Sequence, residues 1–128
     1  MKQVIASLTT LLVFAMTGVA QVDISFQNEL QRSIDRGLDS LQKSQQEGGF
    51  WTNEDHPAVT AIVLVAYHGN PNKPKETPAW VTKAHDHLLK FTQSNGSIYV
   101  PGKGLANYNT ALSMMAMLAS GDAKYNPT

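Results

Sequence analysis

The sequence predicts an all-α protein built from two helical hairpins that follow one another along the chain. The segment 41–51 aligns with the segment 89–99 at an offset of 48 residues (89 − 41). The segment 60–66 aligns with 110–116 at an offset of 50 (110 − 60). Apolar residues also recur at helical spacing between these matches. A period of this length, divided into two helix-like halves, is typical of a helical repeat array.

The first predicted helix covers about residues 25–44. Its apolar positions recur every three or four residues and form one face: Phe26, Leu30, Ile34, Leu38 and Leu41. Such spacing indicates an amphipathic helix with one wet face. The Gly48-Gly49 pair follows, and it allows a turn with positive φ.

The second predicted helix begins near residue 55, with Asp55 as N-cap and Pro57 in the first turn. Ala58–Tyr67 is apolar almost all round, which predicts a helix buried on every side. Its β-branched residues would also suit a buried strand. We favour a helix because the matching segment 111–119 is rich in Ala, Met and Leu.

The third predicted helix opens with Thr77 as N-cap and Pro78 as its first residue, and Asn95-Gly96 ends it. Its apolar stripe consists of Val81, Ala84, Leu88 and Phe91. The fourth predicted helix is capped by Asn107 or Asn109, runs to Ala119 and stops at Gly121.

The two hairpins therefore span about residues 26–69 and 77–121. Helices one and three are expected to form an outer layer with a wet face, and helices two and four an inner layer. The tail 125–128 resembles the opening of the third helix, so we expect the sequence to be a truncated piece of a longer array, with an apolar inner-helix flank that causes self-association.

The first twenty residues predict a secretion signal. Lys2 precedes an apolar run over residues 4–13, and the small residues Gly18 and Ala20 suit cleavage before Gln21. The alternative is a retained membrane anchor, for which the run is short. We therefore expect an exported protein, periplasmic or extracellular, with 21–128 as its mature part.

Composition excludes several kinds of chemistry. Ten basic and ten acidic residues cancel and do not cluster as on a nucleic-acid-binding surface. The absence of Cys excludes disulfides, thiolate zinc ligands and a cysteine nucleophile. His85 and His87 are two apart, which directs them to different sides of a helix, so no metal site is predicted. No cofactor-binding residues are predicted either.

Three groups of polar residues are candidate sites. Asp35 and Asp39 lie four apart, and a solvated helix face explains them better than a proton donor does. The Glu54-Asp55-His56 run suits either capping and turn roles or a polar mouth where the inner helices begin. The triplet 95–97 fits a glycosylation acceptor but also a turn, and we interpret it as a turn.

The ends of the two repeats resemble the QW motif of squalene and oxidosqualene cyclases, which runs from a basic–small pair through hydrophobic residues to Gln, Gly and Trp. The first copy consists of Arg36, Gly37, Leu38, Leu41, Gln45, Gly48, Gly49 and Trp51. The second copy keeps Leu88, Leu89, Gln93 and Gly96 but has Ile98 and Tyr99 in place of Trp. It also lacks the basic–small pair in register.

Related repeats occur in protein prenyltransferase β-subunits. The resemblance covers about residues 26–128 and implies the N-terminal part of an α/α toroid of the terpenoid cyclase and protein prenyltransferase type. It implies a structural role, joining one hairpin to the next, for Gln45, Gly48, Gly49, Trp51, Gln93, Gly96 and Tyr99. The Gln amides would reach the free backbone groups at the start of the following inner helix, and the Trp ring would cover the amide.

No catalytic residue is predicted, because the Asp-x-Asp-Asp run of the cyclases and the zinc ligands of the prenyltransferases are not found in this sequence. We expect an exported, non-catalytic binding or scaffold protein with this fold. Its partners would be further repeats of the same chain, or another protein, on the inner-helix flank. The alternative is the N-terminal part of a cyclase (isomerase) or prenyltransferase (transferase) whose catalytic residues lie in other repeats.

Overall fold

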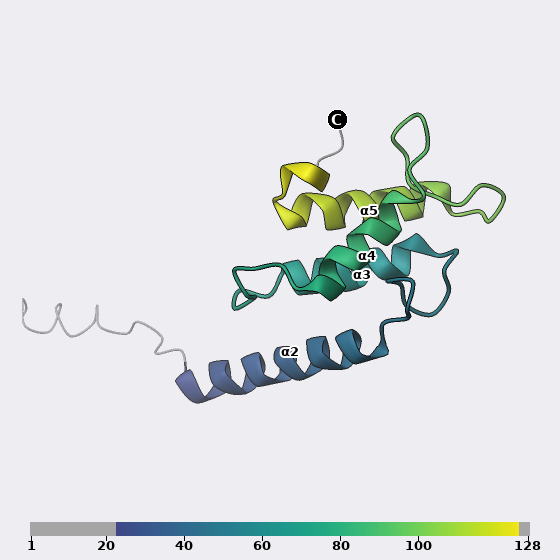
Figure 1. The fold of residues 1–128 in the computed structure, drawn as a ribbon. Helices are drawn as coiled ribbons and strands as arrows, with labels where there is room; N and C mark the ends of the chain where they lie inside the picture. The colour runs from purple at the N-terminus through teal and green to yellow at the C-terminus, as the bar shows by residue number, and fades with distance from the viewer. Residues whose placement is uncertain (1–22, 126–128) are drawn as a thin grey trace, which may run out of the picture. The chain divides into compact units, whose positions relative to one another are not determined.

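The computed structural model describes residues 23–125, and this part of the chain is helical (Figure 1). Its elements are α2 (Ile24–Ser44), α3 (Pro57–His68), α4 (Ala79–Leu89), α5 (Ala106–Ser120) and the short 3-10 helix η1 (Ala123–Tyr125). Within residues 23–125 the only extended pairing is an isolated bridge between Thr92 and Ile98. The predicted all-α class is confirmed. The predicted secretion signal lies outside the described residues.

The chain divides into two units, residues 1–33 and 34–128. The described residues of the first unit are the start of α2, where Phe26 is 62% exposed. No residue of α2 is fully buried. Phe26 and Leu30 are exposed, whereas Leu38 and Leu41 of the same predicted apolar face pack against the core. No helix among the described residues is both long and apolar enough to cross a membrane.

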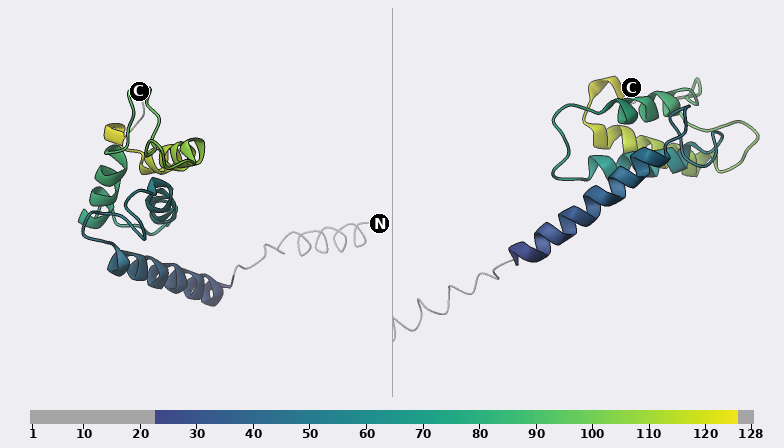
Figure 2. Two further views of the ribbon diagram at one scale, coloured as in Figure 1. Left: turned by 90° about the vertical axis from the view of Figure 1, so that its right-hand side faces the viewer. Right: turned by 60° about the horizontal axis from the view of Figure 1, so that its bottom comes forward.

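In the second unit, α3 lies between two neighbours and packs against both α5 and α4 (Figures 1 and 2). The adjacency of the second and fourth predicted helices is therefore confirmed. The predicted stripe of α4 is confirmed at Val81, Ala84 and Leu88, which are fully buried, whereas Phe91 is half-buried and lies beyond the end of the helix. The core consists of Trp51, Ala61, Val63, Leu64, Tyr67, Val81, Ala84, Leu88, Ile98, Ala116, Met117 and Tyr125.

Helix α3 was predicted to be buried on all sides, and it is not. Neither is α5, the other apolar helix. Ile62 is 48% exposed and Ala66 is also exposed on α3. A helix with two packing partners still presents its remaining face to water. The apolar composition of α3 therefore exceeds what its contacts within the described residues require.

Three predicted helix starts are wrong by one or more residues. The residue before α3 is His56, which makes no capping hydrogen bond, and Asp55 instead pairs with Lys103 at 2.9 Å. Helix α4 starts at Ala79 with Pro78 at the N-cap, so Thr77 is outside it. Local cap preferences therefore misplace both starts by one residue.

The second hairpin differs at both helix ends as well. Helix α5 begins after Leu105, whose left-handed φ of 56° makes the turn, and neither Asn107 nor Asn109 is its cap. Helix α4 already ends at Leu89, and a turn rather than helix leads to Asn95. The predicted stop of α5 is confirmed: Gly121 has a φ of 66° and closes the helix through a hydrogen bond to Leu118.

Candidate interaction surface

The turn that follows α2, within the first hairpin, contacts α4 of the second hairpin directly. The Gln45 side chain donates from Nε2 to the carbonyl oxygen of Trp80 at 2.9 Å. Gly49 adopts a φ of 89°, and a Cβ built on it would lie 2.5 Å from the carbonyl oxygen of Lys83. Both contacts fall on α4. The first turn therefore joins its hairpin to the following outer helix, and not to the start of an inner helix as predicted.

Trp51 also takes part in this contact between the first turn and α4, which we call the joint. Its indole Nε1 donates to the carbonyl oxygen of Leu41 at 2.8 Å, near the end of α2. Its ring packs edge-on against Trp80, with ring centroids 6.1 Å apart. Trp51 is buried, so the side chain satisfies a carbonyl at a helix end and fills the core at the same time.

The second turn repeats the backbone pattern of the first at an offset of 47. Gln46 N donates to Phe50 O at 2.9 Å, and Gln93 N donates to Ser97 O at 2.7 Å. In both turns a left-handed glycine follows, Gly49 and Gly96. This register is one residue shorter than the sequence alignment of Gln45 with Gln93. It makes Ile98, which is buried, the counterpart of Trp51 in place of Tyr99, which is half-buried.

The Gln93 amide does not leave its own turn. Its Nε2 donates to the carbonyl oxygens of Phe91 at 2.8 Å and Tyr99 at 3.0 Å. A Cβ built on Gly96 meets no atom within 4 Å, so no neighbouring backbone packs against this glycine as it does against Gly49. The two copies therefore share a backbone but contact different helices. The first turn reaches α4, whereas the second is bound to α5: the Ile98 N–H donates to Thr110 Oγ1 at 3.0 Å, and the Ile98 carbonyl oxygen accepts from the same hydroxyl at 3.2 Å.

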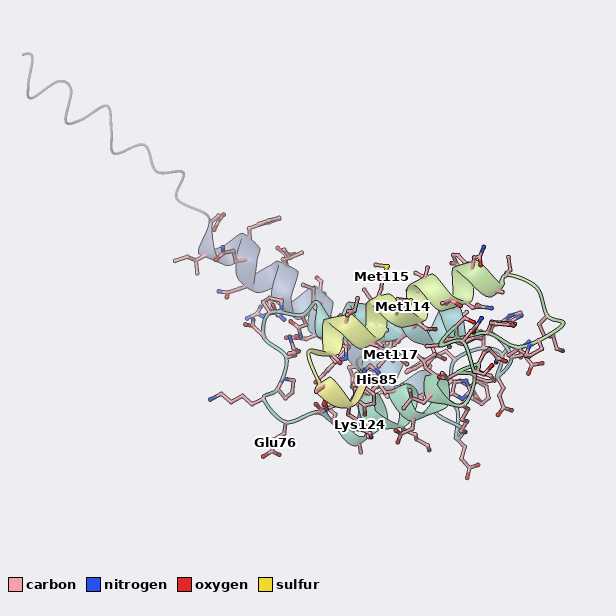
Figure 3. The ribbon with its side chains drawn as sticks, turned by 90° about the horizontal axis from the view of Figure 1, so that it is seen from above. Glu76, His85, Met114, Met115, Met117 and Lys124 are labelled. Carbon is pink, nitrogen blue, oxygen red and sulfur yellow. The ribbon has the colours of Figure 1, made fainter. Side chains whose placement is uncertain are left out.

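The outer face of α5 is apolar and exposed. Met115 and Leu118 are 53% and 59% exposed, and no residue between Ala106 and Ser120 carries a charge. Figure 3 shows Met115 on the outer side of α5 and Met117 on the side toward His85. The apolar outer-face residues are Leu105, Tyr108, Met114, Met115 and Leu118, and we call them the α5 face.

The surface around the predicted polar groups has structural explanations. Asp39 pairs with Lys43 at 2.6 Å on an exposed helix face. The Asn95 side chain accepts a hydrogen bond from Ser97 N at 3.1 Å, as in a turn. No group of three or more His, Asp or Glu side chains in the described chain could hold a metal ion.

An open cleft of about 380 Å³ lies between α2 and α3, and it is almost wholly apolar. Leu38 and Leu41 line one side of the cleft, Val65 and Ala66 the other, and Asn70 is at one end. The cleft brings together no pair of acid, base or nucleophile, so it has no apparent catalytic chemistry.

The sequence predicted no site for the histidines. The structure shows that two of them, His85 and His87, nevertheless have specific surroundings. His85 and His87 are both buried on α4 and do face different surroundings, as their spacing predicted. His87 packs against the rings of Phe50 and Phe91. His85 meets His68, the last residue of α3. That contact joins residues 17 apart in sequence, and no spacing rule within one helix could have found it.

Comparison with known proteins adds no relative. No protein-family model matches the chain, and no curated protein or solved structure is significantly similar to it.

Proposed function

We propose that the chain is an exported, non-catalytic binding scaffold of the α/α toroid type, and that its α5 face docks a helical hairpin of the same kind. The observation that carries this proposal is the uncharged, apolar outer face of α5. An exposed apolar patch bounded by polar surface marks an interaction site more often than a random surface.

The chemistry of the α5 face selects the class of partner. An uncharged helix offers no complement to a charged peptide, and its Met-rich surface suits packing against other aliphatic side chains. Within the chain, α3 already packs against the inner side of α5. A second hairpin on the outer side would bury the α5 face in the same way, and would extend a stack of helices.

The proposal is tested by the state of association of the chain. Sedimentation velocity over a range of concentrations should show self-association, because a second copy supplies the same apolar surface. Met115→Glu should shift the chain to monomers, because it places a charge in the patch that association would bury. Ala79→Glu is the matched control, since Ala79 is exposed on α4 and the charge added is the same.

Two results would refute the binding role. One is that the chain stays monomeric at every concentration and that Met115→Glu leaves its circular dichroism unchanged. The other is an equal effect of Met115→Glu and Ala79→Glu, which would assign the association to overall charge.

Export is supported by the sequence of residues 1–20 and is tested separately. Expression in a host with a secretion pathway should yield extracytoplasmic protein whose mass corresponds to cleavage before Gln21. Protein that stays with the cells at full mass would contradict export without affecting the α5 face.

A further inference from the structure

The strongest unexplained contact lies between two histidine rings. Nε2 of His68, at the end of α3, lies 2.9 Å from Nε2 of His85, in the middle of α4. At that distance one nitrogen must carry a hydrogen and the other a lone pair. The pair therefore holds together only while at least one of the two rings is neutral.

The surroundings of the pair disfavour a positive charge on either ring. His85 is fully buried, and the Nδ1 atoms of both rings are buried without a hydrogen-bond partner. Tyr125 of η1 stacks on the His85 ring, with centroids 4.2 Å apart and planes 15° apart. Tyr125 is itself buried, and this stack holds η1 against α4 together with the exposed ion pair between Lys124 and Asp86 at 3.4 Å.

The nearby charges do not compensate for that burial. Burial, followed by the neighbouring His68, lowers the pKa of His85 to about 4, although the carboxylates of Asp86 and Asp122 oppose the effect; Lys124 adds to it. Burial and the charge of Lys73 lower the pKa of His68 as well. The Lys73 ammonium donates to the carbonyl oxygen of His68 at 2.9 Å, which holds that charge close.

We infer that the His68–His85 pair is a pH-sensitive latch that keeps η1 docked on α4 at neutral pH and releases it in acid. When both rings are protonated, both Nε2 atoms are donors, and two like charges face one another in the core. The pair then separates, and the stack of Tyr125 on His85 is lost with it. The latch is independent of the proposed α5 face, because none of its residues belongs to that face.

The test uses the four tyrosines of the chain as reporters. The full chain is labelled with 3-fluorotyrosine, and its fluorine NMR spectrum is followed from pH 7.5 to pH 3.5. Tyr125→Phe assigns the reporter of the latch. Tyr99 is a half-buried reporter in the second turn, and Tyr108 is an exposed reference. Tyr67 is not used as a control, because its ring lies 5.1 Å from that of His68.

The ordinary and the lowered pKa values of His85 are about 6.5 and about 4. Between these two pH values the Tyr125 signal should move toward its exposed position while the Tyr99 signal stays in place. Movement of both signals together would mean general unfolding and would overturn the latch. A Tyr125 signal that does not move over this range would also overturn it.

A variant shows which group titrates. His85→Phe keeps a ring for Tyr125 to stack on but cannot be protonated, and the half-buried His68 can turn its freed nitrogen toward water. Its Tyr125 signal should be independent of pH; an unchanged acid transition would overturn the assignment. If that variant does not fold, side-chain nitrogen NMR of the wild-type chain decides. A His85 ring protonated near pH 6.5 would contradict the inference, and a ring neutral down to about pH 4 would support it.

Discussion

The side-chain amide of Gln45 donates a hydrogen bond to the carbonyl oxygen of Trp80 across 2.9 Å, 35 residues along the chain. Gln45 follows α2, and Trp80 lies in the first turn of α4. This one bond connects the turn between the two helices of the first hairpin to the opening of the second hairpin. The first three predictions concern this joint.

Gln45→Ala should lower the free energy of unfolding by about 1–2 kcal/mol, because the Trp80 carbonyl loses its side-chain donor. Urea denaturation followed by circular dichroism measures the change. Gln46→Ala is the matched control: Gln46 is exposed and its amide reaches only a carbonyl at 3.5 Å, so its effect should be below ~0.5 kcal/mol. Equal effects of the two substitutions would contradict the joint.

Gly49→Ala should be more costly than Gly96→Ala. Both glycines have positive φ, 89° and 81°, so both substitutions incur a backbone cost of about 1–2 kcal/mol. Only at Gly49 does the new Cβ also meet the Lys83 carbonyl oxygen, at 2.5 Å, which adds roughly 1–3 kcal/mol. Thermal melts of the two variants measure the difference, and indistinguishable melting temperatures would mean that the first turn does not press on α4.

Trp51→Ala should cost about 3–5 kcal/mol, since it empties a buried site beside Trp80 and removes the donor to the Leu41 carbonyl. Trp51→Phe separates the two contributions: it keeps much of the packing and loses the hydrogen bond. Chemical denaturation should rank Trp51→Phe between the wild type and Trp51→Ala. A melt that Trp51→Ala leaves unchanged would remove Trp51 from the core.

Stability should fall in acid because of His85. Its folded-state pKa of about 4 is below the ordinary value of 6.5, so the unfolded chain binds more protons between those two values. The stabilisation is complete above about pH 6.5 and is lost as the pH falls to about 4. The loss amounts to roughly 3 kcal/mol from this one side chain.

Urea denaturation at pH 7.0 and pH 4.5 measures that loss. His85→Phe should remove most of the difference between the two pH values. Leu88, a buried side chain of α4 that cannot be protonated, supplies the control, and Leu88→Val should leave the pH dependence as it is in the wild type. A wild-type stability that is equal at both pH values would contradict a buried neutral His85.

The sequence was sufficient for the helices and insufficient for their ends. The periodic apolar residues of α4 and the glycine at the end of α5 are local signals, and both predictions hold. The starts of α3, α4 and α5 were predicted from local cap preferences, and each lies one or more residues from its predicted position. Asp55 has good cap chemistry, but Lys103 lies across from it and forms an ion pair with it.

The candidate interaction surface was likewise predictable from the sequence only in part. An uncharged, Met-rich helix can be recognised in the sequence, and its exposed face follows once α3 covers one side. The register between the two turns could not be obtained from residue matching, because Ile98 takes the buried place that Trp51 occupies in the first copy. The pairing of His68 with His85 depends on the crossing of α3 and α4, which no local pattern encodes.

The central claim is that the α5 face binds a second helical hairpin, and a distance between copies tests it most directly. The chain contains no Cys, so Leu118→Cys gives a single position for a nitroxide label on that face. Pulsed electron spin resonance on the associated chain should give a short, well-defined distance between labels on two copies. The same label at Ala79→Cys on α4 should give a longer or broader one. A Leu118 label that shows no coupling beyond the background would contradict the account.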